Sequence, residues 1–539
     1  MAKEEKIALF IPPTYDRAVP PLGTPALAGF LKSKGINVAQ GDLNICYFDY
    51  IKKNRLEKIF TSGYRKNKIK KKVYYHKILQ YKGAEISSDY DFEVNPGSSF
   101  AFTEMMLSAK FLHRYIADQK ENPFVDFFYK QVFLKIKKQD FSLIGFSIIC
   151  PSQVMASFTF GYLIKKYFPE TKIVIGGQWV SYYREELQKR NDFNSFYDYL
   201  IYFEGETPLF KLINAIRNNK ALSRVPNLIY QDKGSWKLSS RITQEDMDML
   251  PAPDFDGLNL RKYFNSKRKL TASFETSRGC YWNKCIFCVD LPLPKSRYRE
   301  KSPGLVIKDI KKLIRKYRIR HLMISNAVFS PSQMRQISKK ILKEKIKLSW
   351  WAWARFDDGF DKETLSLAKR AGCSMLGFGL ESINQRVLDF IGKGTRVEVI
   401  KRIIKDSRNL KLNVYFQSII ALPSETVEEA FDTISFLANH SKALNTDCGI
   451  FNVYYQVPKN PAFLNPGNYG IEIIYDKRLP FRFFYPFKHT LGNIDKPKAI
   501  KMLKIYDKIL EYSFKKHRTI VDIVGQQPPD LIPRSKPLL

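Results

Sequence analysis

Three cysteines lie within nine residues near the middle of the chain: Cys280, Cys285 and Cys288. Clustered thiolates without an adjacent histidine suit soft metals. A structural zinc site normally takes a fourth cysteine or histidine at matching spacing. A [4Fe–4S] cluster held by three cysteines instead leaves one iron free to bind a substrate or cofactor. The trio therefore predicts an iron–sulfur cluster, and a zinc site completed from elsewhere in the chain is the alternative.

The remaining cysteines and the apolar segments indicate the compartment. Cys46, Cys150, Cys373 and Cys448 are isolated and are interpreted as packing thiols, so the seven cysteines favour the reducing cytoplasm. The apolar stretch Ile7–Ile11 is short and is followed by two prolines, which predicts a first strand and not a signal peptide. Glycine, serine and proline interrupt the longest uncharged run, between residues 140 and 165, so no transmembrane segment is expected.

The cysteine loop follows the first strand of a predicted series of βα units. Helices are expected between the strands, for example where Val306, Ile310 and Leu313 recur at helical spacing. Six such units predict a partial (β/α)6 barrel over residues 269–460, with the active groups at the carboxyl ends of the strands. The predicted strands are Ala272–Thr276, His321–Ser325, Leu348–Ala354, Met375–Leu380, Leu412–Ile420 and Ile450–Tyr455.

The N-terminal region has a second alternation of strands and helices. This alternation predicts an α/β fold with a Rossmann-like, flavodoxin-like parallel sheet. The expected strands are 7–11, a short one led by Val38, 143–150, 172–175 and 199–203, and the expected helices are 24–34, 154–167 and 208–216. Ligands on such sheets bind beyond the carboxyl ends of the strands. We expect one domain over 1–220 with a basic insertion at 46–139, a proline-punctuated linker over 221–268, and a small helical C-terminal region over 461–539 with a helix near 498–514.

Composition and charge restrict the class of protein further. Hydrophobic residues make up 44% of the 539 residues and charged residues 26%, which excludes disordered, collagen-like and membrane-embedded chains. The 89 Lys and Arg exceed the 53 Asp and Glu, for a net charge of +36, and residues 51–78 carry eleven Lys and Arg against the single acid Glu57. This segment is interpreted as a solvated insertion, and a nucleic-acid or anionic-membrane patch is the alternative. Because no RNA-module motif is present, nucleic acid is not an expected partner.

The cysteine loop after the first strand of a six-unit barrel resembles the radical S-adenosylmethionine (SAM) superfamily. The family spacing places three residues and then two between the cysteines, whereas this chain has four and then two, which should reshape the loop without removing a ligand. Segments 377–382, 392–395 and 422–426 resemble the regions of the family's fourth and fifth strands. Segments 20–28, 176–178, 204–209 and 250–255 resemble the cobalamin-binding class of this superfamily, and the likeness runs with gaps from about residue 5 to 455.

The resemblance implies a set of cofactor contacts. Cys280, Cys285 and Cys288 would hold a [4Fe–4S] cluster whose open iron binds SAM, with SAM contacts from Phe287, Glu381, Arg355 and Gln417. Glu381 has a second interpretation, as part of a salt bridge inside the barrel. Cobalamin contacts are implied at Leu22, Gly23, Ser152, Gly176, Gly177, Gln178, Glu204 and Gly205. No histidine lies in an Asp-x-His-x-x-Gly setting, so the lower axial ligand of that motif is missing.

The resemblance also implies an activity. SAM would be cleaved to a 5′-deoxyadenosyl radical, and methylcobalamin would deliver a methyl group to an unactivated carbon of a small-molecule or peptide substrate. An electron donor would be needed as a partner. Within the class, cyclisation or rearrangement is an alternative outcome, and so is an N-terminal domain that no longer binds cobalamin. An alternative from another class is a basic nucleic-acid-binding protein with a structural metal cluster.

Overall fold

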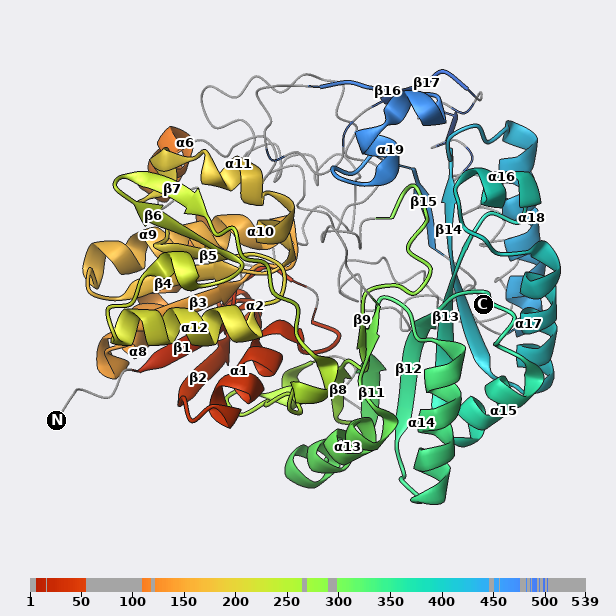
Figure 1. The fold of residues 1–539 in the computed structure, drawn as a ribbon, viewed down its shortest axis with the longest axis horizontal. Coiled ribbons are helices and arrows are strands. Elements are labelled where there is room, and N and C mark those ends of the chain that lie inside the picture. Colours follow the sequence, from red (N-terminus) through yellow and green to blue (C-terminus); the bar gives the residue numbers. More distant parts are fainter. Residues whose placement is uncertain are drawn as a thin grey trace.

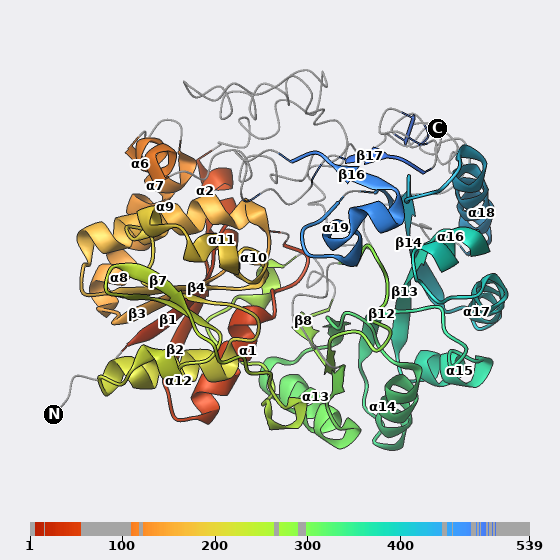
Figure 2. The same cartoon turned by 45° about the horizontal axis from the view of Figure 1, so that its top comes forward.

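The computed structural model describes residues 6–15, 17–54, 109–117, 122–263, 269–288, 298–444, 450–454, 456–475, 481, 485, 487–491, 494, 498, 499 and 502. Two α/β units lie side by side, and three short C-terminal elements lie at one end of the second unit (Figure 1). The turned view in Figure 2 shows the same arrangement. The predicted α/β architecture is therefore confirmed.

The first unit is built on a seven-stranded sheet with the order β2-β1-β3-β4-β5-β6-β7. The first five strands of the chain pair in parallel, as predicted. The last two strands add an antiparallel hairpin at one edge. The bounds are β1 Ile7–Ile11, β2 Val38–Asp42, β3 Leu143–Ser147, β4 Lys172–Gly176, β5 Tyr199–Ile201, β6 Leu228–Asp232 and β7 Ser235–Leu238.

Helices cover both faces of this sheet. Helices α1 (Gly23–Ser33) and α12 (Glu206–Arg217) share one apolar cluster with Ile7 and Leu9 of β1. Helices α2 (Leu43–Lys53) and α9 (Val154–Tyr167) pack on the opposite face. The helices that follow β1 and β3 thus lie on opposite faces, so the topological switch point falls between these two strands. The short helices of this unit are α6 (Ala109–Ala117), α7 (Pro123–Phe127), α8 (Phe133–Gln139), α10 (Gln178–Tyr182) and α11 (Arg184–Gln188).

Two parts of the first unit differ from expectation. The described parts of the predicted insertion are helical and belong to the core, because Tyr47, Leu112 and Phe127 are buried in it. Residues 55–108, which include most of the basic segment 51–78, lie outside the described residues. The hairpin β6–β7 lies in the segment that was predicted as a linker and extends the sheet.

The second unit is a six-stranded parallel sheet with the order β15-β14-β13-β12-β11-β8, as predicted for a partial barrel. Strands β8 and β15 are its two edges, so the barrel is open between them. The strands are β8 Thr271–Phe274, β11 His321–Ile324, β12 Ser349–Ala354, β13 Cys373–Glu381, β14 Asn413–Ile420 and β15 Ile450–Val453. The helices are α13 Pro303–Tyr317, α14 Pro331–Lys343, α15 Lys362–Arg370, α16 Gln385–Phe390, α17 Val397–Asn409 and α18 Val427–Leu444.

The connecting segment holds the two units together through Asp254. Its carboxylate pairs with Lys32 of α1 at 2.7 Å and with Lys316 of α13 at 2.9 Å. Burial pushes the pKa of Asp254 upward, but the hydrogen bonds from Lys316 and Lys32 outweigh it and lower the pKa to about 2. One carboxylate therefore joins a helix of each unit.

The C-terminal region begins after the last barrel strand. It contains α19 (Pro461–Leu464) and an antiparallel pair formed by β16 (Ile471–Ile473) and β17 (Phe487–His489), which the sequence did not predict. The predicted helix near 498–514 lies largely outside the described residues. Among the described helices, none combines the length and the apolar character that crossing a membrane requires.

Candidate active site

The cysteine loop leaves the barrel through a rigid turn. Strand β9 (Ser277–Arg278) pairs with β10 (Arg299–Glu300) immediately before Gly279. Buried Asn326, which follows β11, accepts hydrogen bonds from the backbone N–H groups of Thr276 and Ser277 at 2.8 and 3.2 Å. The start of the loop is therefore fixed at the carboxyl end of the first two barrel strands.

The loop packs against the turn that follows α16. The Ile286 N–H donates to the carbonyl of Ile391 at 3.0 Å, and Trp282 Nε1 donates to the carbonyl of Gly392 at 2.7 Å. A Cβ atom on Gly394 would lie 1.8 Å from the Trp282 ring, and the φ of Gly394 is +62°. Only glycine permits this approach, so the turn at 391–394 forms a wall for the cysteine loop.

A buried ion pair lies beside this wall. Lys393 Nζ is 2.6 Å from Glu381 Oε1, and both side chains are 8% exposed. The same Nζ lies 5.8 Å from the centre of the Phe287 ring. Burial raises the pKa of the Cys285 thiol, Glu381 adds to the rise, and the Lys393 and Arg355 cations oppose it. Two cations thus favour the thiolate form that a metal ligand requires.

Arg355 follows β12 and points at the same loop. Its guanidinium carbon lies 4.5 Å from the centre of the Trp282 ring, and NH1 donates to the carbonyl of Lys393 at 2.9 Å. Its buried Nε makes no hydrogen bond with any residue that the structure describes and is 3.5 Å from Asp357 Oδ2. A buried cationic donor therefore retains hydrogen-bonding capacity beside the cysteines.

The residues predicted around SAM come from four barrel segments. Cys280 and Cys285 interact electrostatically with each other, and Cys285 also interacts with Glu381 and Arg355. Phe287 is half-buried against the barrel core. Gln417 of β14 lies opposite Gly379 of β13 in the strand register, and Gly379 is two residues before Glu381. Glu381 forms the salt bridge that was its second interpretation, and its part in SAM binding stays a prediction.

The donor set suits an iron–sulfur cluster, because three clustered thiolates without a histidine are soft-metal ligands. Among the described residues, no three Cys, His, Asp or Glu side chains converge on one metal position. A [4Fe–4S] cluster binds each thiolate to a different iron and so needs three thiolates spread around a larger group. Cys280, Cys285 and Cys288 lie on one short loop, with Cys285 buried and the other two half-buried. This arrangement is compatible with a cluster that has one side open.

The carboxyl ends of the N-terminal strands are joined to one another. Gln153 Nε2 donates to the carbonyl of Pro12, and its Oε1 accepts from the N–H of Ile149, both at 2.8 Å. Ser152 Oγ donates to the carbonyl of Thr14 at 2.7 Å. The loops that follow β1 and β3 are thus held together at the switch point. Ser152 uses its hydroxyl in this contact.

All four glycines predicted to contact cobalamin pack closely within the chain, and a Cβ atom added to Gly205 would lie 3.3 Å from Leu27 Cδ2. A Cβ atom on Gly177 would lie 2.3 Å from the carbonyl oxygen of Ile148, one on Gly23 would lie 2.9 Å from Ser147 Oγ, and one on Gly176 would lie 3.3 Å from the carbonyl of Ile201. Gly205 and two further predicted cobalamin contacts lie around the same edge. Gln178 is exposed at the start of α10, and Gly205 precedes α12. Leu22 lines a small pocket with Glu206 and Phe274. Their contacts with cobalamin stay predictions.

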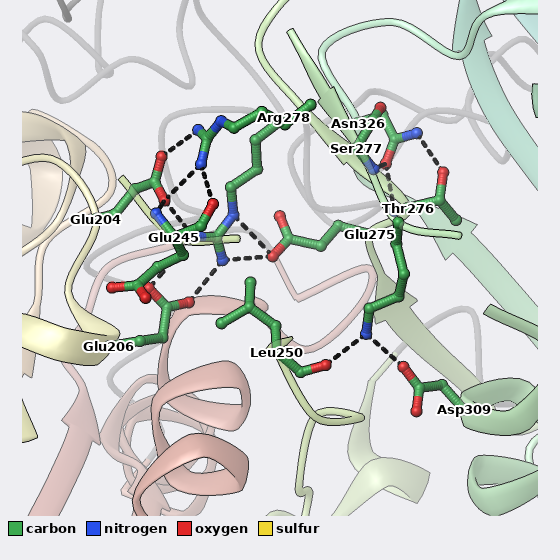
Figure 3. Close-up of polar contacts among 12 residues, drawn as sticks. Glu204, Glu206, Glu245, Leu250, Glu275, Thr276, Ser277, Arg278, Asp309 and Asn326 are labelled. Carbon is green, nitrogen blue, oxygen red and sulfur yellow. Dashed lines mark hydrogen bonds and ion pairs between the residues drawn. The ribbon is translucent and has the colours of Figure 1, made fainter. Parts of the chain in front are cut away.

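An ion network joins the N-terminal edge to the cysteine loop (Figure 3). Arg278 pairs with Glu206 at 2.6 Å, with Glu275 at 2.5 Å and with Glu204 at 3.0 Å, and its side chain is 17% exposed. Arg299 of β10 also pairs with Glu204. Burial acts to lower the pKa of Arg278, but the carboxylates of Glu206 and Glu275 raise it overall. The residue two positions before Cys280 therefore contacts the loop after β5.

Replacement of Arg278 with glutamine is expected to lower the free energy of unfolding by about 3–5 kcal/mol, because it leaves Glu206 and Glu275 without their cation and Glu204 with Arg299 alone. Urea unfolding of the cofactor-free chain measures this loss. Arg396→Gln is the control, since the pair of Arg396 with Asp358 is exposed and should contribute at most about 1 kcal/mol. Equal losses in the two variants would contradict a structural role for the network.

Several of these residues were missed in the sequence. Lys393 lies in a segment that resembled the family, but nothing in the sequence indicated that it pairs with Glu381. Glu204 was expected at cobalamin, and its ion pairs with Arg278 and Arg299 were not foreseen; its contact with cobalamin stays a prediction. Asn326 had no motif around it. The signal available for Lys393 was its position between two glycines, which predicts a constrained turn.

Part of the chain is similar in sequence to known proteins. The model of the radical SAM superfamily matches residues 274–437. An uncharacterized methyltransferase of Pyrococcus horikoshii is 28% identical over 326 residues, which span 60% of this chain and 69% of that protein. An anaerobic magnesium-protoporphyrin IX monomethyl ester cyclase of Rubrivivax gelatinosus is 22% identical over 389 residues, which span 70% and 66%.

A solved structure extends the comparison to the whole fold. The radical SAM methyltransferase TsrM of Kitasatospora setae, solved with cobalamin and a [4Fe–4S] cluster, superposes with a TM-score of 0.59 and 15% identity, over 95% of this chain and 91% of that one. The match includes both α/β units. Residues 274–437 therefore form a radical SAM domain, and the chain has the fold of TsrM, which was solved with cobalamin and a [4Fe–4S] cluster.

Proposed function

We propose that this chain is a cobalamin-dependent radical SAM methyltransferase that acts on an unactivated carbon of a small-molecule or peptide substrate. The observation that carries the proposal is the position of the cysteine loop. It begins two residues after Arg278, whose guanidinium contacts Glu204 and Glu206 at the carboxyl edge of the N-terminal sheet. A cluster on the loop and a corrinoid at that edge would therefore face each other across one interface.

Cys280, Cys285 and Cys288 would hold the cluster. The loop supplies three thiolates, and the Lys393 and Arg355 cations offset part of their negative charge in a buried setting. When bound, the cluster, SAM and cobalamin supply the electron, the radical and the methyl group of the reaction. The chain itself orients these groups and excludes water.

Arg355 and Glu381 would orient SAM. The Nε of Arg355, whose contact with Asp357 is a 3.5 Å ion pair and not a hydrogen bond, is suited to the carboxylate of the methionine moiety, because guanidinium groups bind carboxylates with charge-assisted hydrogen bonds. Glu381 pairs with Lys393 through Oε1, and its carboxylate would also accept a hydrogen bond from the ribose or the methionine amine of SAM. Phe287 would lie beside the adenine, and Gln417 would approach SAM from the next strand.

The N-terminal edge would hold cobalamin at the switch point between β1 and β3. The loops with Leu22, Gly23, Ser152, Gly176, Gly177, Gln178 and Gly205 surround this edge, and Glu204 would act there through the Arg278 network. Among the described histidines, none lies on these loops. These loops would therefore hold cobalamin without a histidine of their own.

The proposal is tested by purification under anaerobic conditions with iron, sulfide and hydroxocobalamin supplied. We expect one [4Fe–4S] cluster by iron analysis and electron paramagnetic resonance, and one corrinoid by absorption after extraction. After a low-potential reductant such as titanium(III) citrate has reduced the corrinoid to cob(I)alamin, addition of SAM should transfer its labelled methyl group to the cobalt and release S-adenosylhomocysteine. A preparation that carries the cluster but no stoichiometric corrinoid would overturn the cobalamin-dependent assignment.

Cyclisation is a second candidate, supported by the 22% identity with the Rubrivivax gelatinosus cyclase. The two outcomes differ in the product, because methylation adds the mass of one CH2 group and cyclisation adds none. Either reaction requires an electron donor for the cluster. The oxygen-sensitive thiolate ligands favour a reducing compartment, and we propose the cytoplasm.

A further inference from the structure

The segment after the last barrel strand returns to the cysteine loop. The N–H of Ala462 donates to the carbonyl of Ile286 at 3.1 Å, and Asn460 Nδ2 donates to the carbonyl of Phe287 at 3.4 Å. Ile286 and Phe287 are the two residues between Cys285 and Cys288. Because β8 and β15 are the two edges of the open barrel, these hydrogen bonds join loops that leave its opposite edges.

The same segment is also attached to the N-terminal unit. Lys459 Nζ donates to the carbonyl of Tyr182, at the end of α10, and lies 3.6 Å from the carboxylate of Glu185. Further along, Phe481 packs with its ring centre 5.6 Å from that of Trp179. The segment thus contacts the cysteine loop and also the first unit, and these contacts fix its position.

Asn460 makes two hydrogen bonds with its buried side-chain amide. Its side chain caps α19, because Oδ1 accepts from the N–H of Phe463 at 2.7 Å. Its Nδ2 donates to Phe287, and the residue is 1% exposed. A buried amide that loses one partner leaves an unsatisfied polar group, so its orientation is strongly determined.

We propose that Asn460 is a positioning residue for the cluster: it fixes the peptide between Cys285 and Cys288 and thereby aims both thiolates. The inference rests on the proposed function, in which these cysteines bind the cluster. Both sides of the turn are then held, since Ile391 accepts from the N–H of Ile286 and the 460–462 segment donates to the carbonyls of Ile286 and Phe287. Residues that orient metal ligands affect metal affinity by 10–100-fold in general.

Two variants separate positioning from helix capping. Asn460→Ser keeps a capping oxygen but has no amide to reach Phe287. Asn460→Asp keeps the cap and presents an acceptor to the Phe287 carbonyl. The reconstituted cluster should release iron to a chelator about tenfold faster in both variants than in the wild-type chain. The electron paramagnetic resonance spectrum of the reduced, SAM-free cluster should also change in both variants.

Asn122→Ser is the matched control. Asn122 is fully buried, caps α7 through the N–H of Phe124 at 3.0 Å and donates to Thr159 at 3.0 Å, within the N-terminal unit. It should lower the melting temperature of the cofactor-free chain without changing iron release. Wild-type iron release in Asn460→Ser would overturn the positioning role. A wild-type chain that binds no cluster would instead overturn the proposed function.

Discussion

Replacing Cys280, Cys285 or Cys288 with alanine is expected to remove the iron–sulfur cluster and to abolish reductive cleavage of SAM. Each cysteine would supply one of the three protein ligands of the cluster, so its loss should leave one iron without a thiolate. The affinity for the cluster should fall at least about 100-fold, since even residues that only orient metal ligands contribute up to that factor. Iron content, cluster absorption and 5′-deoxyadenosine formation measure the loss.

Cys46 and Cys373 are matched controls, one from each unit. Cys46 is half-buried on α2, and Cys373 is 2% exposed at the start of β13. Burial raises the pKa of both thiols, as expected for packing residues. Alanine at either position should leave the iron content unchanged. A single loop variant that keeps full iron content and full SAM cleavage would contradict the assignment of that cysteine.

The alternating strands and helices were predictable because their apolar periodicity is local. The predicted helix 154–167 matches α9, and the six barrel strands were placed to within a few residues. The hairpin β6–β7 was missed. Its turn has positive φ at both Lys233 (49°) and Gly234 (79°), which is the geometry of a type I′ turn. Lysine is not among the residues that signal such a turn, so the sequence pattern was weak.

The cysteine loop was predictable from its spacing, but the contacts around it were not. Lys393 pairs with Glu381, Arg278 with Glu204, and Asn460 contacts Phe287 across 173 residues. With 89 basic and 53 acidic residues, a single sequence permits far more ion pairs than the fold uses. Which of the possible contacts form depends on which distant loops the fold brings close together, and a single sequence does not show this.

Replacing Gly177 with alanine is expected to damage the N-terminal edge more than any other small substitution there. The φ of Gly177 is +107°, and the added Cβ would lie 2.3 Å from the carbonyl oxygen of Ile148. That carbonyl also accepts from the N–H of Trp179 at 3.3 Å, so the clash falls on the contact between the loops after β3 and β4. Strain and overpacking together should lower the free energy of unfolding by about 2–5 kcal/mol.

Gly234→Ala separates backbone strain from the clash. Gly234 also has a positive φ, +79°, but no atom lies within 4 Å of its added Cβ. Its substitution should cost only about 1–2 kcal/mol. If the edge binds cobalamin, Gly177→Ala should also weaken corrinoid binding at least about tenfold, while Gly234→Ala leaves it unchanged. Normal corrinoid binding by a folded Gly177→Ala chain would mean that the loops after β3 and β4 do not form the cobalamin site.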